Sequence, residues 1–234
     1  MQTKQVQALK RRYQNEKHNY NQDFRLRIYR ALSWLAMADE KLSLPEPELD
    51  CAFIALWIAF NAAYAQELVT PVIPARNNFQ KFLHLICQFD NKQLYDLVWN
   101  QFSDDIRILI DNRYIFQPFW DYQNDEISEE KYLQSFQDAK KKANASLAKQ
   151  ETDTLLAIVF DRLYTLRNQI IHGGSTYGSS VNRATLKNGC NFLRQCMIAI
   201  LSVMMTYFNN PAWGKPFYPL VDDNHTKRPT HSAF

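Results

Sequence analysis

Apolar residues return at alternating steps of three and four along segment 152–172, a spacing that turns them all to one face of an α-helix. They are Leu156, Val159, Leu163, Leu166 and Ile170. Gly173 follows directly, where a left-handed residue commonly ends a helix. A half-buried strand requires two-residue alternation, and the chain shows no convincing example. The sequence therefore predicts an all-α protein.

Further helices are predicted wherever the same period recurs. The clearest segments are 24–42, 49–66, 132–147 and a last helix that ends before Asn209-Asn210-Pro211. Shorter patterns lie between residues 79 and 110. Because a short connection joins the helices predicted at 24–42 and 49–66, we expect these two helices to pack antiparallel.

The chain divides into three parts by composition and period. Residues 1–23 form a basic N-terminal arm, residues 24–208 a helical domain, and residues 209–234 a proline-rich tail. Segment 71–150 interrupts the longest helical patterns and is interpreted as a helical insertion in that domain.

Composition excludes several classes of enzyme. Glycine is scarce, with five in 234 residues, and neither G-x-G-x-x-G nor G-x-x-x-x-G-K-[ST] occurs, which excludes dinucleotide-binding and P-loop chemistry. The cysteines are too widely spaced for metal-binding C-x-x-C pairs. They are Cys51, Cys87, Cys190 and Cys196. We therefore expect no metal and no cofactor.

Two observations bear on location. Residues 1–17 are polar and lack the apolar core of a secretory signal. The most apolar run, Cys196–Phe208, covers 13 residues, whereas a membrane-spanning helix needs roughly 18–20. Together with unpaired thiols, these features predict a cytoplasmic protein that does not contact a membrane.

Positive charge is concentrated at the N-terminus. Residues 1–30 hold eight lysines and arginines against two acidic residues, in a chain of net charge +3. Tyr13, Tyr20 and Tyr29 are interspersed, a mixture that can pair with phosphates and stack on bases. The solvated face of an amphipathic helix explains the same pattern, and both interpretations stay open.

The helix at 152–172 ends in Arg167-Asn168-Gln169-Ile170-Ile171-His172. At about 100° per residue, Asn168 and His172 lie about 40° apart, and the long Arg167 side chain can reach round from about 140°. Arginine offers paired donors to a phosphate, and histidine transfers protons at cellular pH. The three side chains can converge on one phosphate. The alternative is that Arg167 and His172 only cap helix carbonyls.

This ending resembles the R-x-x-x-x-H signature of the HEPN superfamily, in which a polar residue typically follows the arginine. Arg30–Glu40 and Phe53–Tyr64 are similar to the first two helices of bacterial members. The resemblance covers residues 24–66 and 152–208. It implies an up-down bundle of about four helices that forms a homodimer with a composite active site.

Many members of this superfamily are metal-independent endoribonucleases that drive the RNA 2′-hydroxyl onto the adjacent phosphate. The resemblance implies that His172 is the acid or base, that Arg167 holds the phosphate and that Asn168 orients either. It implies RNA as substrate, a toxin or antiphage effector as the role, and an antitoxin or defence-system protein as partner. In some members a tyrosine two residues after the histidine is modified, and Gly174 stands there in this chain.

Three more residues are candidates near the motif. Arg183 and Lys187 are four apart at the start of the last helix, and we predict that they contact the RNA backbone. A solvated surface pair is the alternative. Asn61 lies at the margin of an aromatic stripe, where its amide either faces the motif or binds backbone.

Two other functions stay open: a non-catalytic HEPN module that binds RNA, a nucleotide or a protein, and a structural subunit of a larger defence assembly. Weaker sites are Asp125 with Glu129-Glu130-Lys131, which faintly resembles a metal-dependent nuclease motif, and Asp222-Asp223-Asn224-His225 in the tail. His84 falls within a helical pattern and is interpreted as an ordinary packed or surface histidine.

Overall fold

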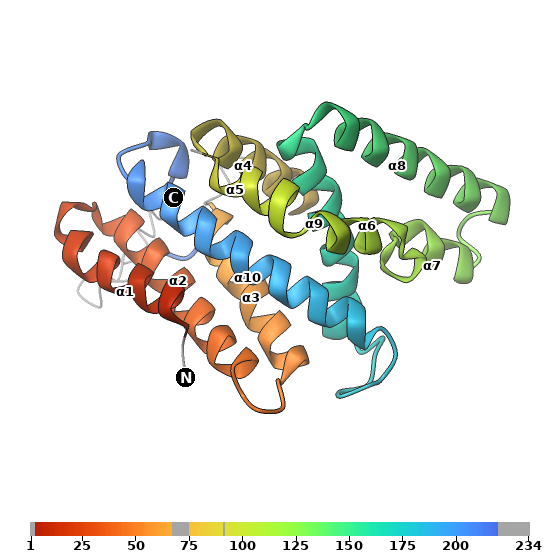
Figure 1. Ribbon diagram of the computed structural model, residues 1–234, viewed down its shortest axis with the longest axis horizontal. Coiled ribbons are helices and arrows are strands. Elements are labelled where there is room, and N and C mark those ends of the chain that lie inside the picture. The colour runs from red at the N-terminus through yellow and green to blue at the C-terminus, as the bar shows by residue number, and fades with distance from the viewer. Residues whose placement is uncertain (1–2, 67–74, 91, 220–234) are drawn as a thin grey trace, which may run out of the picture.

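A computed structural model of the chain describes residues 3–66, 75–90 and 92–219 (Figure 1). The described residues form helices and short helical turns, with no β-strand among them, so the protein is all-α as predicted. α1 and α2 lie at one end of the molecule and α7 and α8 at the other, with α3, α9 and α10 between them (Figure 1).

The first predicted pair of helices is present with nearly the predicted bounds. α2 spans Gln22–Leu42 and α3 spans Leu49–Tyr64. α2 and α3 pack on each other, and small side chains shorten the distance between packed helices. Both helices bury several small side chains almost fully. They are Ala31 and Ala38 on α2 and Ala52, Ala55, Ala59 and Ala63 on α3.

α9 and α10 complete the core. α9 spans Thr152–Ile171 and α10 spans Arg183–Thr206, as the apolar periods predict. The rings of Phe60 on α3 and Phe160 on α9 have centroids 4.6 Å apart. Gly189 on α10 leaves room for this packing, because an added Cβ would lie 3.1 Å from Leu163 and 3.5 Å from Phe53.

Segment 71–150 contributes to the core as well as to the periphery. α4 spans Ala75–Phe89 and packs on α9, with Phe79 and Leu83 fully buried. α5 (Gln93–Asp96), a π-helical stretch (Leu97–Gln101) and α6 (Ser103–Asp111) follow. The first half of the predicted insertion is therefore part of the bundle.

The second half of this segment forms a helical hairpin. The 3₁₀ turn Arg113–Ile115 leads into α7 (Gln117–Gln123), which packs on α8 (Glu129–Lys149). Arg162 of α9 is 2% exposed, and its guanidinium lies 4.0 Å from the ring centroid of Phe116 and 5.7 Å from that of Phe136. A cation desolvated against aromatic rings in this way fastens the hairpin to α9.

The basic N-terminal segment folds as a docked helix. α1 spans Lys4–Glu16 and buries Val6, Leu9 and Tyr13. Asp39 of α2, which is fully buried, accepts hydrogen bonds from the backbone and hydroxyl of Thr3 and from Arg194 Nη1 at 3.2 Å. A buried carboxylate needs such donors, so Asp39 joins the start of α1, α2 and α10.

The described part of the tail packs back on the bundle. Trp213 is 3% exposed and donates from Nε1 to the carbonyl of Tyr207 at 2.7 Å. Pro216 pairs with Gln66 in an isolated bridge. Asp222-Asp223-Asn224-His225 lies outside the described residues.

One helix of the described residues, α10, is long and apolar enough to cross a membrane by length and composition alone. Within its apolar window, 67% is buried inside the bundle, as the packing of a core helix requires.

Arg27 joins α2 to the end of α3 and to the tail. It is 1% exposed and donates to the carbonyls of Ala63 and Ala65, both at 2.8 Å, and to that of Gly214 at 3.4 Å. The carbonyls at a helix C-terminus have no partners within the helix, so Arg27 satisfies groups that would otherwise be buried unpaired. Burial lowers the pKa of Arg27 to about 10, which leaves it charged at neutral pH.

We expect Arg27→Met to lower the free energy of unfolding by about 3 kcal/mol, because it leaves buried carbonyls without donors. Urea denaturation followed by circular dichroism measures this change. Arg25→Met is the matched control, since Arg25 is exposed on the same helix, and should change stability by less than about 0.5 kcal/mol. Equal effects of the two substitutions would show that the hydrogen bonds of Arg27 to α3 and the tail do not stabilise the protein.

Candidate functional site

The end of α9 is a regular helix termination. Gly173 has φ +73°, a conformation that favours glycine. Its N–H donates to the carbonyl of Ile170 at 3.3 Å, and the N–H of Gly174 donates to that of Gln169 at 2.7 Å. This pair of bonds is a Schellman motif, so the predicted cap at Gly173 is confirmed. His172 is the last residue before the chain turns away.

Arg167 and Asn168 are joined directly. Arg167 Nη1 donates to Asn168 Oδ1 at 3.0 Å, and both side chains are half-buried. Arg167 Nε is buried and has no hydrogen-bond partner among the described residues. Burial raises the pKa of Tyr64 to about 12, with a smaller contribution from Tyr164, and the nearby charge of Arg167 partly offsets that rise. The guanidinium therefore lies towards the C-terminal end of α3.

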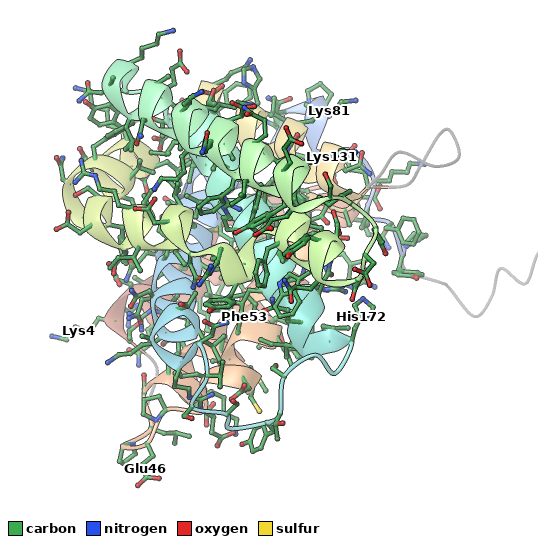
Figure 2. The ribbon with its side chains drawn as sticks, turned by 90° about the vertical axis from the view of Figure 1, so that its right-hand side faces the viewer. Lys4, Glu46, Phe53, Lys81, Lys131 and His172 are labelled. Atoms are coloured by element: carbon green, nitrogen blue, oxygen red, sulfur yellow. The ribbon has the colours of Figure 1, made fainter. Side chains whose placement is uncertain are left out.

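His172 is exposed, and its backbone N–H donates to the carbonyl of Asn168 at 2.9 Å. Figure 2 shows His172 at the end of α9, below the start of α8 in that view. In the part of the chain that the structure describes, no hydrogen bond joins its imidazole to Arg167 or Asn168. The three predicted residues thus share one helix end, with the arginine and the amide already linked and the histidine exposed.

The 3₁₀ turn before α7 packs directly against the motif. The carbonyl of Tyr114 accepts hydrogen bonds from Gln169 Nε2 and from Trp120 Nε1, the latter at 2.8 Å. Gln169 lies inside the motif, between Asn168 and His172. The sequence predicts no helix and no role for Tyr114, so it does not reveal this neighbour.

Arg183 and Lys187 lie at the start of α10 with different surroundings. Arg183 Nη1 forms an ion pair with Asp50 Oδ2, whose side chain is 11% exposed. That pairing offsets the charge that would attract a phosphate. Lys187 is exposed. Nearby, Asn112 Nδ2 donates to Thr185 Oγ1 at 2.8 Å and ties the end of α6 to α10.

The amide oxygen of Asn61 does not make the backbone contact that was considered for it. Asn61 Oδ1 is buried and has no hydrogen-bond partner in the described structure. Asn61 is one turn before Tyr64 on α3, whose phenol is within electrostatic reach of Arg167. A buried acceptor of this kind is costly unless a donor or water reaches it.

A second cluster of polar side chains lies at the other end of α9. His84 Nδ1 is 2.7 Å from Asp153 Oδ2. A hollow of about 460 Å³ beside them is lined by Cys87, Asp90, Lys92, Tyr95 and Thr152.

Two polar groups that line this hollow have structural surroundings that make them poor catalysts. Asp90 accepts hydrogen bonds from the N–H groups of Gln93, Leu94 and Tyr95 and so caps α5. Burial raises the pKa of the Cys87 thiol to about 12, so this thiol is protonated and a poor nucleophile at neutral pH. The hollow lacks the activated group that catalysis would need.

The remaining candidates are ordinary surface residues. Asp125, Glu129 and Glu130 are exposed around the start of α8, on a helix and not on the strands that the nuclease motif expects. Among the described residues, no group of histidine, cysteine and acidic side chains could hold a metal ion.

A search for related proteins found no match to the chain among protein-family models, curated proteins or solved structures. The resemblance to the HEPN superfamily therefore rests on the quoted residues alone.

We expect Gly173→Ala to destabilise the protein by about 1 kcal/mol, because alanine is strained at positive φ. It should also speed hydrogen exchange of the Gly174 amide, which closes the Schellman motif. Gly178→Ala is the matched control: Gly178 has φ +71° but lies in the following loop. The control should cost similar stability and leave exchange at Gly174 unchanged. Equal exchange in both variants would contradict this account of the helix end.

Proposed function

We propose that the protein is a HEPN-type, metal-independent endoribonuclease. The observation that carries the proposal is the end of α9, where Arg167, hydrogen-bonded to Asn168 at 3.0 Å, shares one helix end with the exposed His172. The three side chains supply a phosphate-binding cation, an orienting amide and a proton carrier. No other described cluster combines these properties.

The reaction is an intramolecular transesterification in RNA, in which the phosphoryl group is transferred from the 5′-oxygen to the 2′-oxygen. The 2′-hydroxyl loses its proton and attacks the adjacent phosphorus, and the bond from phosphorus to the 5′-oxygen breaks. The products are a 2′,3′-cyclic phosphate and a 5′-hydroxyl. His172 takes the first proton or delivers the second to the leaving oxygen.

Arg167 stabilises the charge that develops on the phosphate oxygens. Its role is demanding here because a helix C-terminus carries partial negative charge, which repels a phosphate. A guanidinium close to that end offsets the repulsion and supplies two donors. Asn168 accepts a hydrogen bond from one guanidinium nitrogen and so limits the orientations of the Arg167 guanidinium.

The proposal extends to the assembly and the setting of the protein. Two copies related by a two-fold axis bring two motifs together, so that one histidine can act as base while the other acts as acid. The substrate is RNA, and the setting is the cytoplasm. The role is that of a toxin or antiphage effector restrained by an antitoxin or defence-system partner.

A non-catalytic HEPN module that binds RNA, a nucleotide or a protein is the second candidate. It is favoured by one observation: the His172 imidazole makes no hydrogen bond to Arg167 or Asn168 among the described residues. A motif kept only for binding would need the cation and not the proton carrier.

We expect the purified protein to cleave RNA in the presence of EDTA and to leave 2′,3′-cyclic phosphate or 3′-phosphate ends. His172→Ala should lower the rate about 100-fold or more, because it removes the proton carrier. Gel analysis of total RNA and tRNA gives the rate, and mass spectrometry gives the end groups. His18→Ala is the matched control, since His18 is exposed in the 3₁₀ turn between α1 and α2.

Each outcome decides between the candidates. Cleavage that His172→Ala leaves unchanged would show that the site is wrong, and loss of cleavage in EDTA would remove the metal-independent mechanism. An Arg167→Ala, His172→Ala double variant that binds RNA and behaves like the wild type would favour the binding module.

A further inference from the structure

A patch of aromatic side chains with one arginine lies beside the motif, and it belongs to the segment outside the HEPN resemblance. We call it the Tyr114 patch and define it by Arg113, Tyr114, Phe119 and Trp120. Tyr114 is 43% exposed, Arg113 is exposed, and the two other side chains are half-buried. A large aromatic ring left open next to a catalytic motif needs an explanation.

Two hydrogen bonds fix the patch against the end of α9. The carbonyl of Tyr114 accepts from Trp120 Nε1 within the patch and from Gln169 Nε2 within the motif. Gln169 and His172 are three apart on α9, and residues at that spacing are neighbours about 5–6 Å apart at Cβ. The carbonyl of Tyr114 is therefore bound to a residue that lies one helical turn before His172.

The exposed ring is rigidly oriented and carries a neighbouring positive charge. The ring of Phe119 meets that of Tyr114 at 84° with centroids 5.4 Å apart. The guanidinium of Arg113 lies 5.3 Å from the Tyr114 centroid. No carboxylate among the described residues forms an ion pair with Arg113, so its charge is available to an anion.

The Arg113 guanidinium lies over one face of the Tyr114 ring, so a base can stack on the opposite face of the ring or on the guanidinium plane itself. Nucleobases stack on aromatic rings regardless of sequence, and the flanking phosphates pair with arginine. A base inside a duplex is already stacked, so this mode selects single-stranded RNA. Two of the three N-terminal tyrosines that might have served in this way, Tyr13 and Tyr20, are buried.

We propose that the Tyr114 patch is a base-stacking subsite that binds an unpaired nucleotide next to the phosphate held by Arg167 and His172. This inference rests on the proposed function, because RNA is the occupant that the motif requires. The ring of Tyr114 stacks on the base, and Arg113 pairs with the next phosphate. The subsite makes the enzyme selective for loops and unpaired ends.

The test compares Tyr114→Ala with a matched substitution. Tyr207 is 41% exposed, packs on one ring (Phe89, 5.0 Å) and accepts a hydrogen bond from Trp213 Nε1 through its carbonyl, as Tyr114 does from Trp120. It lies at the other end of α10 from Thr185. Substitution of either tyrosine leaves its backbone carbonyl in place. The two variants therefore lose a similarly exposed ring and differ in where that ring lies.

Binding is measured in full-length protein with His172→Ala, in which the RNA stays intact. Fluorescence anisotropy of a short labelled single-stranded RNA should show Kd raised about tenfold by Tyr114→Ala and unchanged by Tyr207→Ala. Tyr114→Trp should restore binding. RNAs that each carry one abasic nucleotide should reveal the position of the stacked base. At that position, loss of the base should weaken RNA binding by the protein that retains Tyr114 and leave RNA binding by the Tyr114→Ala variant unchanged.

The outcomes separate this inference from the proposed function. If wild-type protein cleaves RNA through His172 while Tyr114→Ala binds and cuts like Tyr207→Ala, the subsite is overturned and the ribonuclease stands. If no RNA is cleaved, but Tyr114→Ala weakens RNA binding and removes the effect of one abasic position, the subsite is supported and the catalytic proposal is overturned. Absence of RNA binding overturns both, and tight capture of a protein by this patch alone would assign it to a protein partner.

Discussion

The packing of Phe160 on Phe60, with ring centroids 4.6 Å apart, sets α9 against α3 at the centre of the molecule. α4, α6, α8 and the 3₁₀ turn before α7 also pack on α9. α4 covers one side of it, Leu163 fits beside Gly189 of α10, and Arg162 holds the α7–α8 hairpin on the opposite side. Because the motif is the last turn of this same helix, whatever fixes α9 also fixes the motif.

Buried charges give the bundle its specific arrangement. Arg27 satisfies the end of α3, Asp39 joins α1 to α2 and α10, and Arg162 is desolvated between two aromatic rings. Burying such groups is costly, and a hydrophobic replacement of similar size can be as stable. Their effect is to disfavour other arrangements of the same helices, since any shift would leave a buried charge without its partners.

The proposed function depends on two segments that lie far apart in the sequence. α9 and its cap place Arg167, Asn168 and His172 on one helix end, which is where the proposed acid–base chemistry would take place. The segment from Arg113 onward adds an aromatic surface next to that end through the bond between Gln169 and the Tyr114 carbonyl. Catalysis and selection of the substrate would then reside on separate elements, and the latter could change without disturbing the former.

The long core helices could be predicted from the residues alone, because an apolar period and a terminal glycine act within a few residues of chain. The sequence therefore placed Arg167 and His172 on one helix end correctly. The neighbours of those residues become visible once the helices are packed together. Arg183 is predicted to contact phosphate but forms an ion pair with Asp50. Tyr114 lies in no predicted helix, and its carbonyl accepts a hydrogen bond from Gln169. These contacts join residues more than fifty positions apart, and local periodicity carries no information about partners at that distance.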